Sequence, residues 1–389
     1  MALFNKNNNN NKKKANYISI KESRKISREN FKKTQELERM RSLMTRDDYI
    51  TEMKDKNNVL EIDNLHTYFF TDIGVVKAVN GVSFSIPKGK TVGVVGESGC
   101  GKSVTSLSVL QLVQRPQGQI VDGAIRFNDE DIAYDIAKMP VDEMQKIRGN
   151  KISMIFQEPM TSLNPVFRIG AQINEVIELH NPELDQEKVT ARTIELLDLV
   201  GIANSGGVYK MYPHELSGGM RQRVMIAMAL ACNPKLIIAD EPTTALDVTI
   251  QAQILDLLKN LKDKINSSIM LITHDLGVIA EMADYVVVMY AGKVVEQGLA
   301  SEVFSNPSHP YTIGLMNSKP SINKKVNRLY SIPGKVPNPI NMPNYCFFRD
   351  RCDRAFEKCA GPYPDTYSLT DSHSVACYHY EKEERDDNK

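Results

Sequence analysis

The feature that most constrains this chain is the glycine-rich segment at residues 96–103, which reads GESGCGKS. It fits the pattern GxxxxGK[ST], whose glycines let backbone N–H groups curl around an anion while the lysine reaches the β- and γ-phosphates. A strand-like apolar run at residues 91–95 precedes it and a helix-like run at 104–113 follows, as this pattern requires. We therefore expect an α/β core that binds a nucleotide. The predicted contacts to the nucleotide are Gly96, Glu97, Ser98, Gly99, Cys100, Gly101, Lys102, Ser103 and Val104.

A second anion-binding device lies about 115 residues downstream, at residues 216–222, LSGGMRQ. A serine–glycine turn that opens a helix points free N–H groups and the positive end of the helix dipole at an anion. One nucleotide does not need both devices, so we expect the second to serve a nucleotide held by another subunit. The residues predicted for this contact are Ser217, Gly218, Gly219 and Gln222.

Two adjacent carboxylates, Asp240 and Glu241, follow the apolar run at residues 236–239. Such a run is typical of a buried parallel strand, which delivers both side chains at its carboxyl end. Mg²⁺ prefers oxygen ligands, so one carboxylate and the Ser103 hydroxyl can hold the metal. The other carboxylate can orient or deprotonate an attacking water. The spacing therefore predicts hydrolysis as well as binding.

Together these motifs resemble the nucleotide-binding subunits of ATP-binding-cassette (ABC) transporters, over residues 59–377. The resemblance implies an ABC-type nucleotide-binding domain, with a RecA-like core and a helical subdomain, that binds ATP and Mg²⁺. It assigns Asp240 to the metal and Glu241 to catalysis as the base. Gln157 matches the glutamine that touches Mg²⁺ and the lytic water, and His274 matches the histidine at the γ-phosphate.

The resemblance extends to two further contacts. Asp247 ends the loop at residues 245–247, which in the family couples the two nucleotide-binding subunits. Phe69 is the best match for the aromatic residue that stacks on adenine, although Tyr68 and Phe70 flank it and each of the three also suits a place in the core.

The changes in composition along the chain divide it into three parts. Residues 1–57 are polar and basic, so we expect a largely disordered extension, with a charged helix as an option over residues 27–44. A solvated tail is the plain interpretation, and an arm that rests on anionic lipid headgroups is the sharper one. Residues 58–300 form the nucleotide-binding domain, with the helical subdomain at about 158–232, and residues 301–389 form a C-terminal domain.

No apolar run reaches the ~18 residues that a membrane-spanning helix needs, and the N-terminus has no signal-peptide pattern. We therefore expect a peripheral protein on the cytoplasmic face of the membrane. The resemblance implies two membrane permease subunits and a second, related ATPase subunit, with a heterodimer favoured over a homodimer. It also implies an extracellular solute-binding protein as an indirect partner, and no nucleic acid.

Four cysteines mark the C-terminal domain: Cys346, Cys352, Cys359 and Cys377. A cytosolic chain holds few stable disulfides, so four clustered thiols indicate metal ligation. An iron–sulfur cluster and tetrahedral zinc both accept four thiolates. The spacing lacks close C-x₂-C pairs, which favours iron–sulfur over zinc, and free thiols remain the third possibility. The remaining cysteines, Cys100 and Cys232, are expected as small buried residues.

The sequence of the C-terminal domain also indicates which class of solute is transported. The segments at residues 306–312 and 332–337, followed by the four cysteines, resemble the tail of oligopeptide and dipeptide importer ATPases, some of which bind a [4Fe–4S] cluster. Asn344 and Tyr345 stand where a glycine is common before the first cysteine. Nickel importers share much of this pattern, so a nickel or other solute importer stays as the alternative. The other classes are a soluble ABC ATPase acting on nucleic acid and a subunit without hydrolytic activity.

Overall fold

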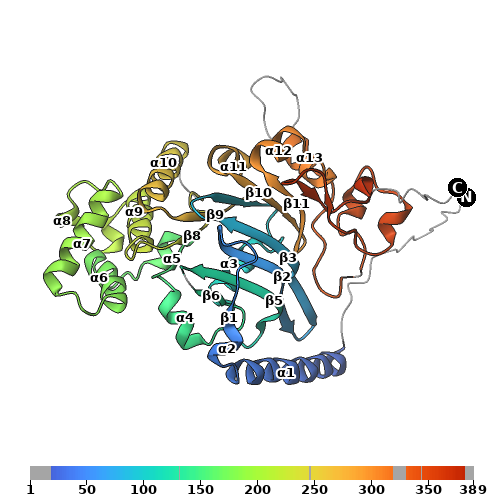
Figure 1. Cartoon of the computed structure of the whole chain (residues 1–389), viewed down its shortest axis with the longest axis horizontal. Helices are drawn as coiled ribbons and strands as arrows, with labels where there is room; N and C mark the ends of the chain where they lie inside the picture. Colours follow the sequence, from blue (N-terminus) through green and yellow to red (C-terminus); the bar gives the residue numbers. More distant parts are fainter. Residues whose placement is uncertain (1–18, 131, 245–246, 319–329, 343, 382–389) are drawn as a thin grey trace, which may run out of the picture.

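The computed structural model describes residues 19–130, 132–244, 247–318, 330–342 and 344–381. Two sheets form the centre of the molecule (Figure 1). A group of helices lies at one end, and the C-terminal segment, which comprises the described residues from 301 to 381, extends to the other end.

The larger sheet is built on five parallel strands in the order β10-β4-β9-β8-β7. Most residues of these strands are buried, which explains their continuous apolar sequences. Their bounds are β4 Thr91–Val95, β7 Ile152–Ile155, β8 Leu236–Asp240, β9 Ser268–Thr273 and β10 Tyr285–Tyr290. Antiparallel strands extend the β10 edge in the order β11 (Lys293–Leu299), β13 (Ser374–Val375) and β12 (Tyr367–Ser368). The strands expected at residues 91–95 and 236–239 are therefore confirmed.

The smaller sheet is antiparallel, in the order β1-β6-β5-β2-β3. Its long strands β2 and β3 form a hairpin. The bounds are β1 Ile50–Thr51, β2 Asn58–Thr71, β3 Gly74–Pro87, β5 Gly118–Asp129 and β6 Ile132–Asp135. Residues Leu60, Ile62 and Val82 of this sheet share a buried core with Val92 and Val94 of β4, so the two sheets pack as one unit.

Helices cover the parallel strands and form the group at one end. Helix α3 (Lys102–Val109) follows β4, and α4 (Val141–Ile147) precedes β7. The end group consists of α5 Pro159–Ser162, α6 Ile169–His180, α7 Gln186–Leu199, α8 Ser205–Val208 and α9 Gly218–Ala229 (Figure 1). Helices α10 (Val248–Ile265) and α11 (Leu276–Met282) return the chain to the sheet, and α12 (Ala300–Ser305) and α13 (Pro310–Asn317) follow β11. The structure therefore has the α/β core and helical segment that the sequence predicted.

The N-terminal segment differs from the expectation that residues 1–57 are largely disordered. Helix α1 spans Ile20–Ser42, and the short helix α2 (Arg46–Tyr49) follows it. The helix packs on the smaller sheet through one face, where Thr34 is buried and the Asn30 amide donates to the Thr71 carbonyl at 2.6 Å. Charged composition alone predicted disorder because it does not reveal this packing surface. The first 18 residues lie outside the described part of the chain.

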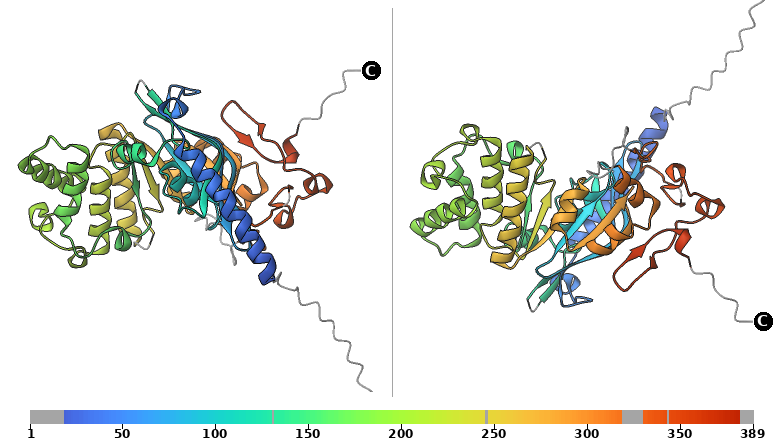
Figure 2. Two further views of the ribbon diagram at one scale, coloured as in Figure 1. Left: turned by 90° about the horizontal axis from the view of Figure 1, so that it is seen from below. Right: turned by 90° about the horizontal axis from the view of Figure 1, so that it is seen from above.

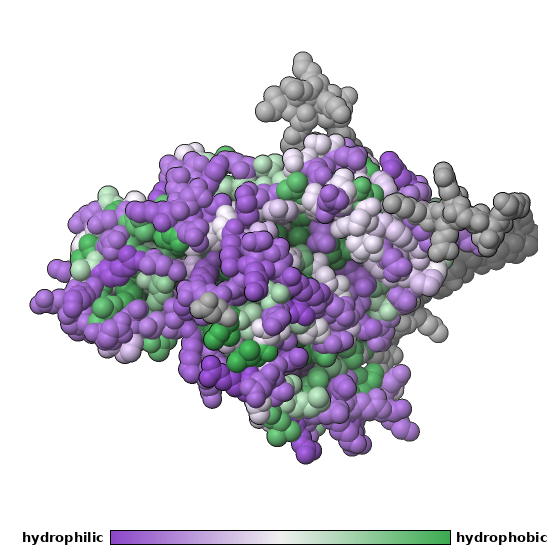
Figure 3. Space-filling model, viewed as in Figure 1, coloured by the Kyte–Doolittle hydropathy of each residue, from purple (hydrophilic) through white to green (hydrophobic). Residues whose placement is uncertain are grey.

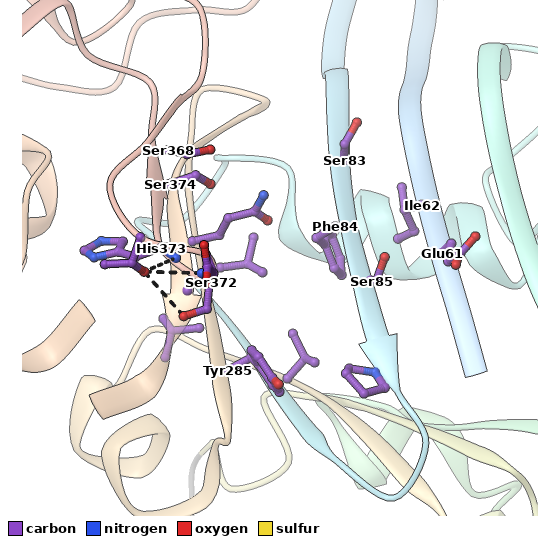
Figure 4. Close-up of a pocket in the computed structure, with 18 of the residues that line it drawn as sticks. Glu61, Ile62, Ser83, Phe84, Ser85, Tyr285, Ser368, Ser372, His373 and Ser374 are labelled. Carbon is purple, nitrogen blue, oxygen red and sulfur yellow. Dashed lines mark hydrogen bonds between the residues drawn. The ribbon is translucent and has the colours of Figure 1, made fainter. Parts of the chain in front are cut away.

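Beyond α13, the C-terminal segment contains little regular structure, with 3₁₀ turns at Arg349–Arg351, Glu357–Ala360 and Tyr378–Tyr380. An open groove separates part of it from β3 (Figure 4). Ser372, His373 and Ser374 lie on one side of this groove, and Phe84 and Ser85 of β3 lie on the other. No residue of the segment 96–103 lines the groove, so it is separate from the predicted nucleotide site. The domain boundaries at 57/58 and 300/301 stay predictions.

The molecular surface seen in Figure 3 is mostly hydrophilic, with apolar residues in small groups. Within the described residues, no helix is both long enough and apolar enough to cross a bilayer.

Candidate functional site

The predicted catalytic residues meet at one edge of the parallel sheet. The segment 96–103, hereafter the phosphate loop, leaves the carboxyl end of β4, and His274 follows β9. Asp240 ends β8, and Gln157 lies just beyond β7. These four strands are neighbours in the order β4-β9-β8-β7, so their carboxyl ends deliver the four segments side by side. Ligand sites of open α/β sheets lie at this edge.

The phosphate loop has the shape that its glycines predict. Gly101 has φ 102° and Gly96 has φ 153°. A Cβ atom at Gly101 would come within 2.4 Å of the Ala78 carbonyl oxygen, so only glycine fits there. The buried Lys102 amine donates to the carbonyls of Gly96, at 2.7 Å, and Glu97, at 3.2 Å. The loop thus folds around its own lysine, the group expected to reach the phosphates.

Ser103 and Asp240 form the oxygen pair expected to hold Mg²⁺. The Ser103 hydroxyl donates to Asp240 Oδ1 at 3.1 Å. Burial raises the pKa of Asp240, while the hydrogen bond from Ser103 opposes that rise. A divalent cation would offset the cost of burying this carboxylate and take both oxygens as ligands. The two residues therefore fit Mg²⁺.

Glu241 is the centre of a polar cluster. Its carboxylate accepts from the Gln157 amide at 3.0 Å and from the Thr244 hydroxyl at 2.9 Å, and it lies 3.2 Å from His274 Nδ1. Its backbone has φ 47°, in the left-handed region that non-glycine residues rarely adopt. Such a conformation persists where the surroundings fix it, and it often marks a functional residue. The structure therefore brings Gln157, Glu241 and His274 together.

The serine–glycine motif caps a helix in another part of the molecule. Ser217 is the N-cap of α9, and its hydroxyl accepts from the Met220 N–H at 3.3 Å. Ser217 and Gly218 are exposed, and the Gln222 amide is buried and donates to the Pro242 carbonyl at 2.5 Å. Helix α9 belongs to the end group, whereas α3 follows the central strand β4 (Figure 1; Figure 2 gives two further views).

The two remaining predicted contacts differ in how well the structure defines them. Asp247 is the N-cap of α10 and accepts from the Ile250 N–H at 3.0 Å, while Ala245 and Leu246 lie outside the described residues. Phe69 lies on β2 beside Gly118, where an added Cβ atom would come within 2.9 Å of the ring. Stacking of Phe69 on adenine stays a prediction.

Comparison with known proteins identifies the family. Residues 79–244 match the ABC transporter family model, and residues 295–359 match the model for the oligopeptide/dipeptide transporter, C-terminal region. The chain is 52% identical to the oligopeptide transport ATP-binding protein AppD of Bacillus subtilis over 327 residues, which cover 84% of this chain and 98% of AppD. The chain belongs to the ABC transporter ATP-binding proteins.

Further relatives of this ABC protein agree. It is 47% identical to the dipeptide transport ATP-binding protein DppD of Bacillus subtilis, with 82% of this chain and 94% of DppD covered. It is 48% identical to the oligopeptide transport ATP-binding protein OppD of Haemophilus influenzae, with 78% and 92% covered. Among solved structures, it resembles the dimeric post-hydrolysis state of the cassette MJ0796 bound to ADP and Pi, with TM-score 0.55 and 26% identity. That match covers 62% of this chain and 98% of the cassette. The ABC ATPase fold and the ATPase activity predicted from the sequence are thereby confirmed.

Sequence reasoning missed two residues that touch the phosphate loop of this ABC protein. The Tyr311 hydroxyl accepts from the Glu97 N–H at 2.8 Å. Arg351 forms a paired contact with the Glu97 carboxylate, and this hydrogen bonding raises the pKa of Arg351. Both residues lie in segments that the resemblance had marked, but no spacing rule connects them to a loop more than 200 residues away.

The four C-terminal cysteines line one small cavity, together with His309 and His379. Cys359 and Cys377 are buried, and all four are free thiols. Burial and the neighbouring thiols raise the pKa of Cys346 to about 11, and burial also raises the pKa of Cys352 and Cys377. In the described residues, no group of three or more His, Cys, Asp or Glu side chains is arranged to hold a metal ion. Cys100 is buried as expected, and Cys232 is half-buried.

Proposed function

We propose that this protein hydrolyses ATP to power the import of oligopeptides or dipeptides through a membrane ABC transporter. The observation that carries this proposal is its identity of about one half, over nearly their whole length, to relatives named for oligopeptide and dipeptide transport. The match of residues 295–359 to the oligopeptide/dipeptide C-terminal region supports the same solute class. The ATPase subunit does not itself bind the solute, so the test must use the assembled transporter.

The geometry supports a hydrolytic mechanism based on positioning and charge. The phosphate-loop N–H groups and Lys102 would bind the β- and γ-phosphates, and Ser103, Asp240 and Gln157 would hold Mg²⁺. When bound, the metal neutralises charge on the phosphate oxygens. Glu241 orients the attacking water and takes its proton, while Gln157 and His274, which contact its two carboxylate oxygens, fix its position. From its match to the family's histidine, we expect His274 also to contact the γ-phosphate of bound ATP.

We further propose that the site is completed by the serine–glycine motif of a second ATPase subunit, a related chain rather than an identical copy. Ser217 and Gly218 are exposed at the start of α9, and the N-terminus of this helix is free to meet an anion. The similar cassette MJ0796 was solved as a dimer, which supports pairing.

Ser217→Ala should leave ATP binding to the single chain unchanged and abolish the cooperative hydrolysis of the assembled pair. Full hydrolysis by that assembly would contradict the shared site, and native mass spectrometry of it separates a heterodimer from a homodimer.

We also propose that this chain contacts one of the two permease subunits of the transporter, and an apolar groove supports this contact. It lies between the parallel sheet and the end group of helices, next to Gln157, and Phe156 lines it. Beyond it, Val166 and Phe167 are exposed, in the stretch 158–170 that we expect to meet a permease helix. The remaining apolar lining comes from Leu110, Leu112, Ile152, Met154, Leu163, Val176, Met225, Met228 and Ala229. Through this contact the protein would sit at the cytoplasmic face of the membrane, with the extracellular solute-binding protein reached only indirectly.

The decisive experiment isolates a tagged chain from solubilised membranes and identifies the proteins that accompany it. We expect two permeases and a second ATPase, and the reconstituted complex should accumulate labelled oligopeptide in an ATP-dependent manner. Pro159→Leu should reduce uptake more than ATP turnover, and unchanged uptake would count against the contact at residues 158–170. If the reconstituted complex takes up nickel but not peptide, the solute is nickel and the peptide assignment is wrong. If nucleic acid co-purifies with the chain and no permease does, the transport function is overturned.

We also propose that Cys346, Cys352, Cys359 and Cys377 hold a [4Fe–4S] cluster. Support comes from the gathering of the four thiols around one cavity and from the absence of disulfides among the described cysteines. Anaerobic purification should give a brown protein with about four iron and four sulfide per chain. A colourless protein that holds one zinc would favour a tetrahedral zinc site, and a metal-free protein would leave four reduced thiols.

A further inference from the structure

The buried guanidinium of Arg351, in the C-terminal segment, forms an ion pair with Glu97 of the phosphate loop. The Arg351 side chain is 5% exposed, and its guanidinium forms two parallel contacts with the Glu97 carboxylate, Nη1–Oε2 at 2.6 Å and Nη2–Oε1 at 2.9 Å. Paired contacts of this kind are among the strongest and most directional hydrogen bonds in proteins. They fix the orientation of Glu97 as well as its position.

Arg351 is itself held in place by its own surroundings. Its Nε donates to the Pro333 carbonyl at 2.7 Å, and its Nη1 lies 3.3 Å from the Tyr290 hydroxyl. The backbone N–H of Arg351 donates to the Phe348 carbonyl at 2.9 Å, within the turn that leads from Cys346 to Cys352. Phe348 packs against the Tyr290 and Tyr311 rings, at centroid distances of 5.2 and 5.4 Å. The guanidinium is therefore preorganised before it meets Glu97.

Glu97 connects the Arg351 ion pair to Lys102, the residue expected to bind phosphate. Its N–H donates to the Tyr311 hydroxyl at 2.8 Å, so two residues of the C-terminal segment hold it, one at the backbone N–H and one at the carboxylate. Its carbonyl accepts from the Lys102 amine at 3.2 Å, next to the Gly96 carbonyl. A shift of Glu97 would move the carbonyl that holds the lysine and turn the loop N–H groups away from the phosphates.

We propose that Arg351 is a positioning residue for nucleotide binding, which sets the shape of the phosphate loop through Glu97. The C-terminal segment thereby determines how tightly the protein binds ATP, although it contributes no group to the phosphates. Arg351 directly precedes Cys352, so the shape of the loop depends on how the segment around the four cysteines is folded. The inference rests on ATP binding by the phosphate loop and is independent of the transported solute and of any metal at the cysteines.

Three variants of the full chain test this proposal: Arg351→Gln, Arg351→Lys and Glu97→Ala. The first and third remove the pair from opposite ends, and lysine keeps the charge but loses the planar two-pronged contact. We expect the Kd for a fluorescent ATP analogue with Mg²⁺ to rise about tenfold in Arg351→Gln and Glu97→Ala, and by less in Arg351→Lys. The double variant, with Arg351→Gln and Glu97→Ala together, should bind the ATP analogue about as weakly as either single variant, because each substitution removes the same Arg351–Glu97 interaction.

Arg349→Gln is the matched control. Arg349 lies in the same turn, but it pairs with Asp350 and stacks on Tyr345 at the surface. Its loss should leave the Kd within about twofold of the parent. Steady-state kinetics of ATP hydrolysis give a second measurement. A displaced phosphate loop should raise the KM for ATP more than it lowers kcat in each variant of Arg351 or Glu97.

A purely structural role for the pair predicts a different result. Thermal melting would then fall in Arg351→Gln and Glu97→Ala, while the folded protein would keep the parental Kd and KM. That outcome overturns the proposal. Should Arg351→Gln fail to fold, Glu97→Ala decides, because it leaves every contact within the C-terminal segment intact.

Discussion

The catalytic edge of the parallel sheet and the C-terminal segment place their polar groups by opposite means. At the sheet edge, backbone hydrogen bonds between strands bring Gln157, Asp240 and His274 together, since each lies at or just beyond the carboxyl end of a strand and these strands pair side by side. In the C-terminal segment, single buried side chains hold the chain in place. Glu296 of β11 accepts from the N–H groups of Ser308 and His309, each at 2.8 Å, and contacts His373 Nε2 at 2.8 Å. Substitutions at the catalytic edge should therefore reduce ATP hydrolysis without unfolding the protein. Substitutions of the buried groups that hold the C-terminal segment should instead reduce the stability of the fold first.

The largest effect is expected for Glu241→Gln at the catalytic edge. Glutamine keeps the size of the side chain but cannot take the proton of the attacking water, so hydrolysis should fall at least about 100-fold. ATP binding should be retained, and the closed dimer should accumulate. Phosphate release and nucleotide titration measure the two effects. Turnover near that of the parent would contradict the role of Glu241 as the base.

Glu296→Gln should have the largest effect on stability in the C-terminal segment. Glutamine has one acceptor oxygen where the buried carboxylate uses two, so buried donors lose their partner and the free energy of unfolding should fall by about 2–4 kcal/mol. Urea unfolding provides the measurement. Glu302→Gln is the control, because Glu302 bonds Thr370 and Ser372 at the surface. Equal losses in both variants would deny the central role of Glu296.

A smaller, pH-dependent effect is expected at His309. Burial lowers its pKa to about 3 in the folded chain, from about 6.5 when unfolded. Below pH 6.5 the unfolded chain binds the proton and the folded chain does not, so stability falls as the pH decreases, by up to about 1.4 kcal/mol per pH unit. Unfolding free energies between pH 7 and pH 5 test this. His309→Asn, which keeps an acceptor for the Tyr311 N–H, should flatten the dependence, and a slope as steep as that of the parent would assign it to other groups.

The smallest catalytic effect is expected from removal of α1. A chain that begins at Met44 should hydrolyse ATP within about twofold of the parent, because α1 packs on β2 and β5 of the antiparallel sheet, whereas the catalytic residues lie at the carboxyl edge of the parallel sheet. The exposed face of α1 carries Lys21, Arg24, Lys25 and Arg28, so co-sedimentation with vesicles that contain anionic lipid should weaken. Unchanged co-sedimentation would leave α1 without a role at the membrane.

Much of the catalytic edge could be predicted from the sequence because its causes are local. The strand at residues 91–95, the loop glycines and the lysine follow one another directly, and the apolar run at 236–239 ends at the carboxylates. A helix was predicted only as an option, over residues 27–44, and the observed α1 spans Ile20–Ser42, because its stability depends on a packing surface supplied by distant strands. Phe69 was chosen among three aromatic residues that the sequence does not distinguish.

By itself, the sequence determined the ATP-binding chemistry, since each of its elements is a short run of residue types in a fixed order. Only the tertiary structure decided that Glu97 is held by Tyr311 and Arg351, and that four cysteines spread over 32 residues line one cavity. The physical reason is that the partner of a buried group is set by packing rather than by spacing along the chain, and the contacts of Glu97 join segments more than 200 residues apart through buried charge and hydroxyl groups.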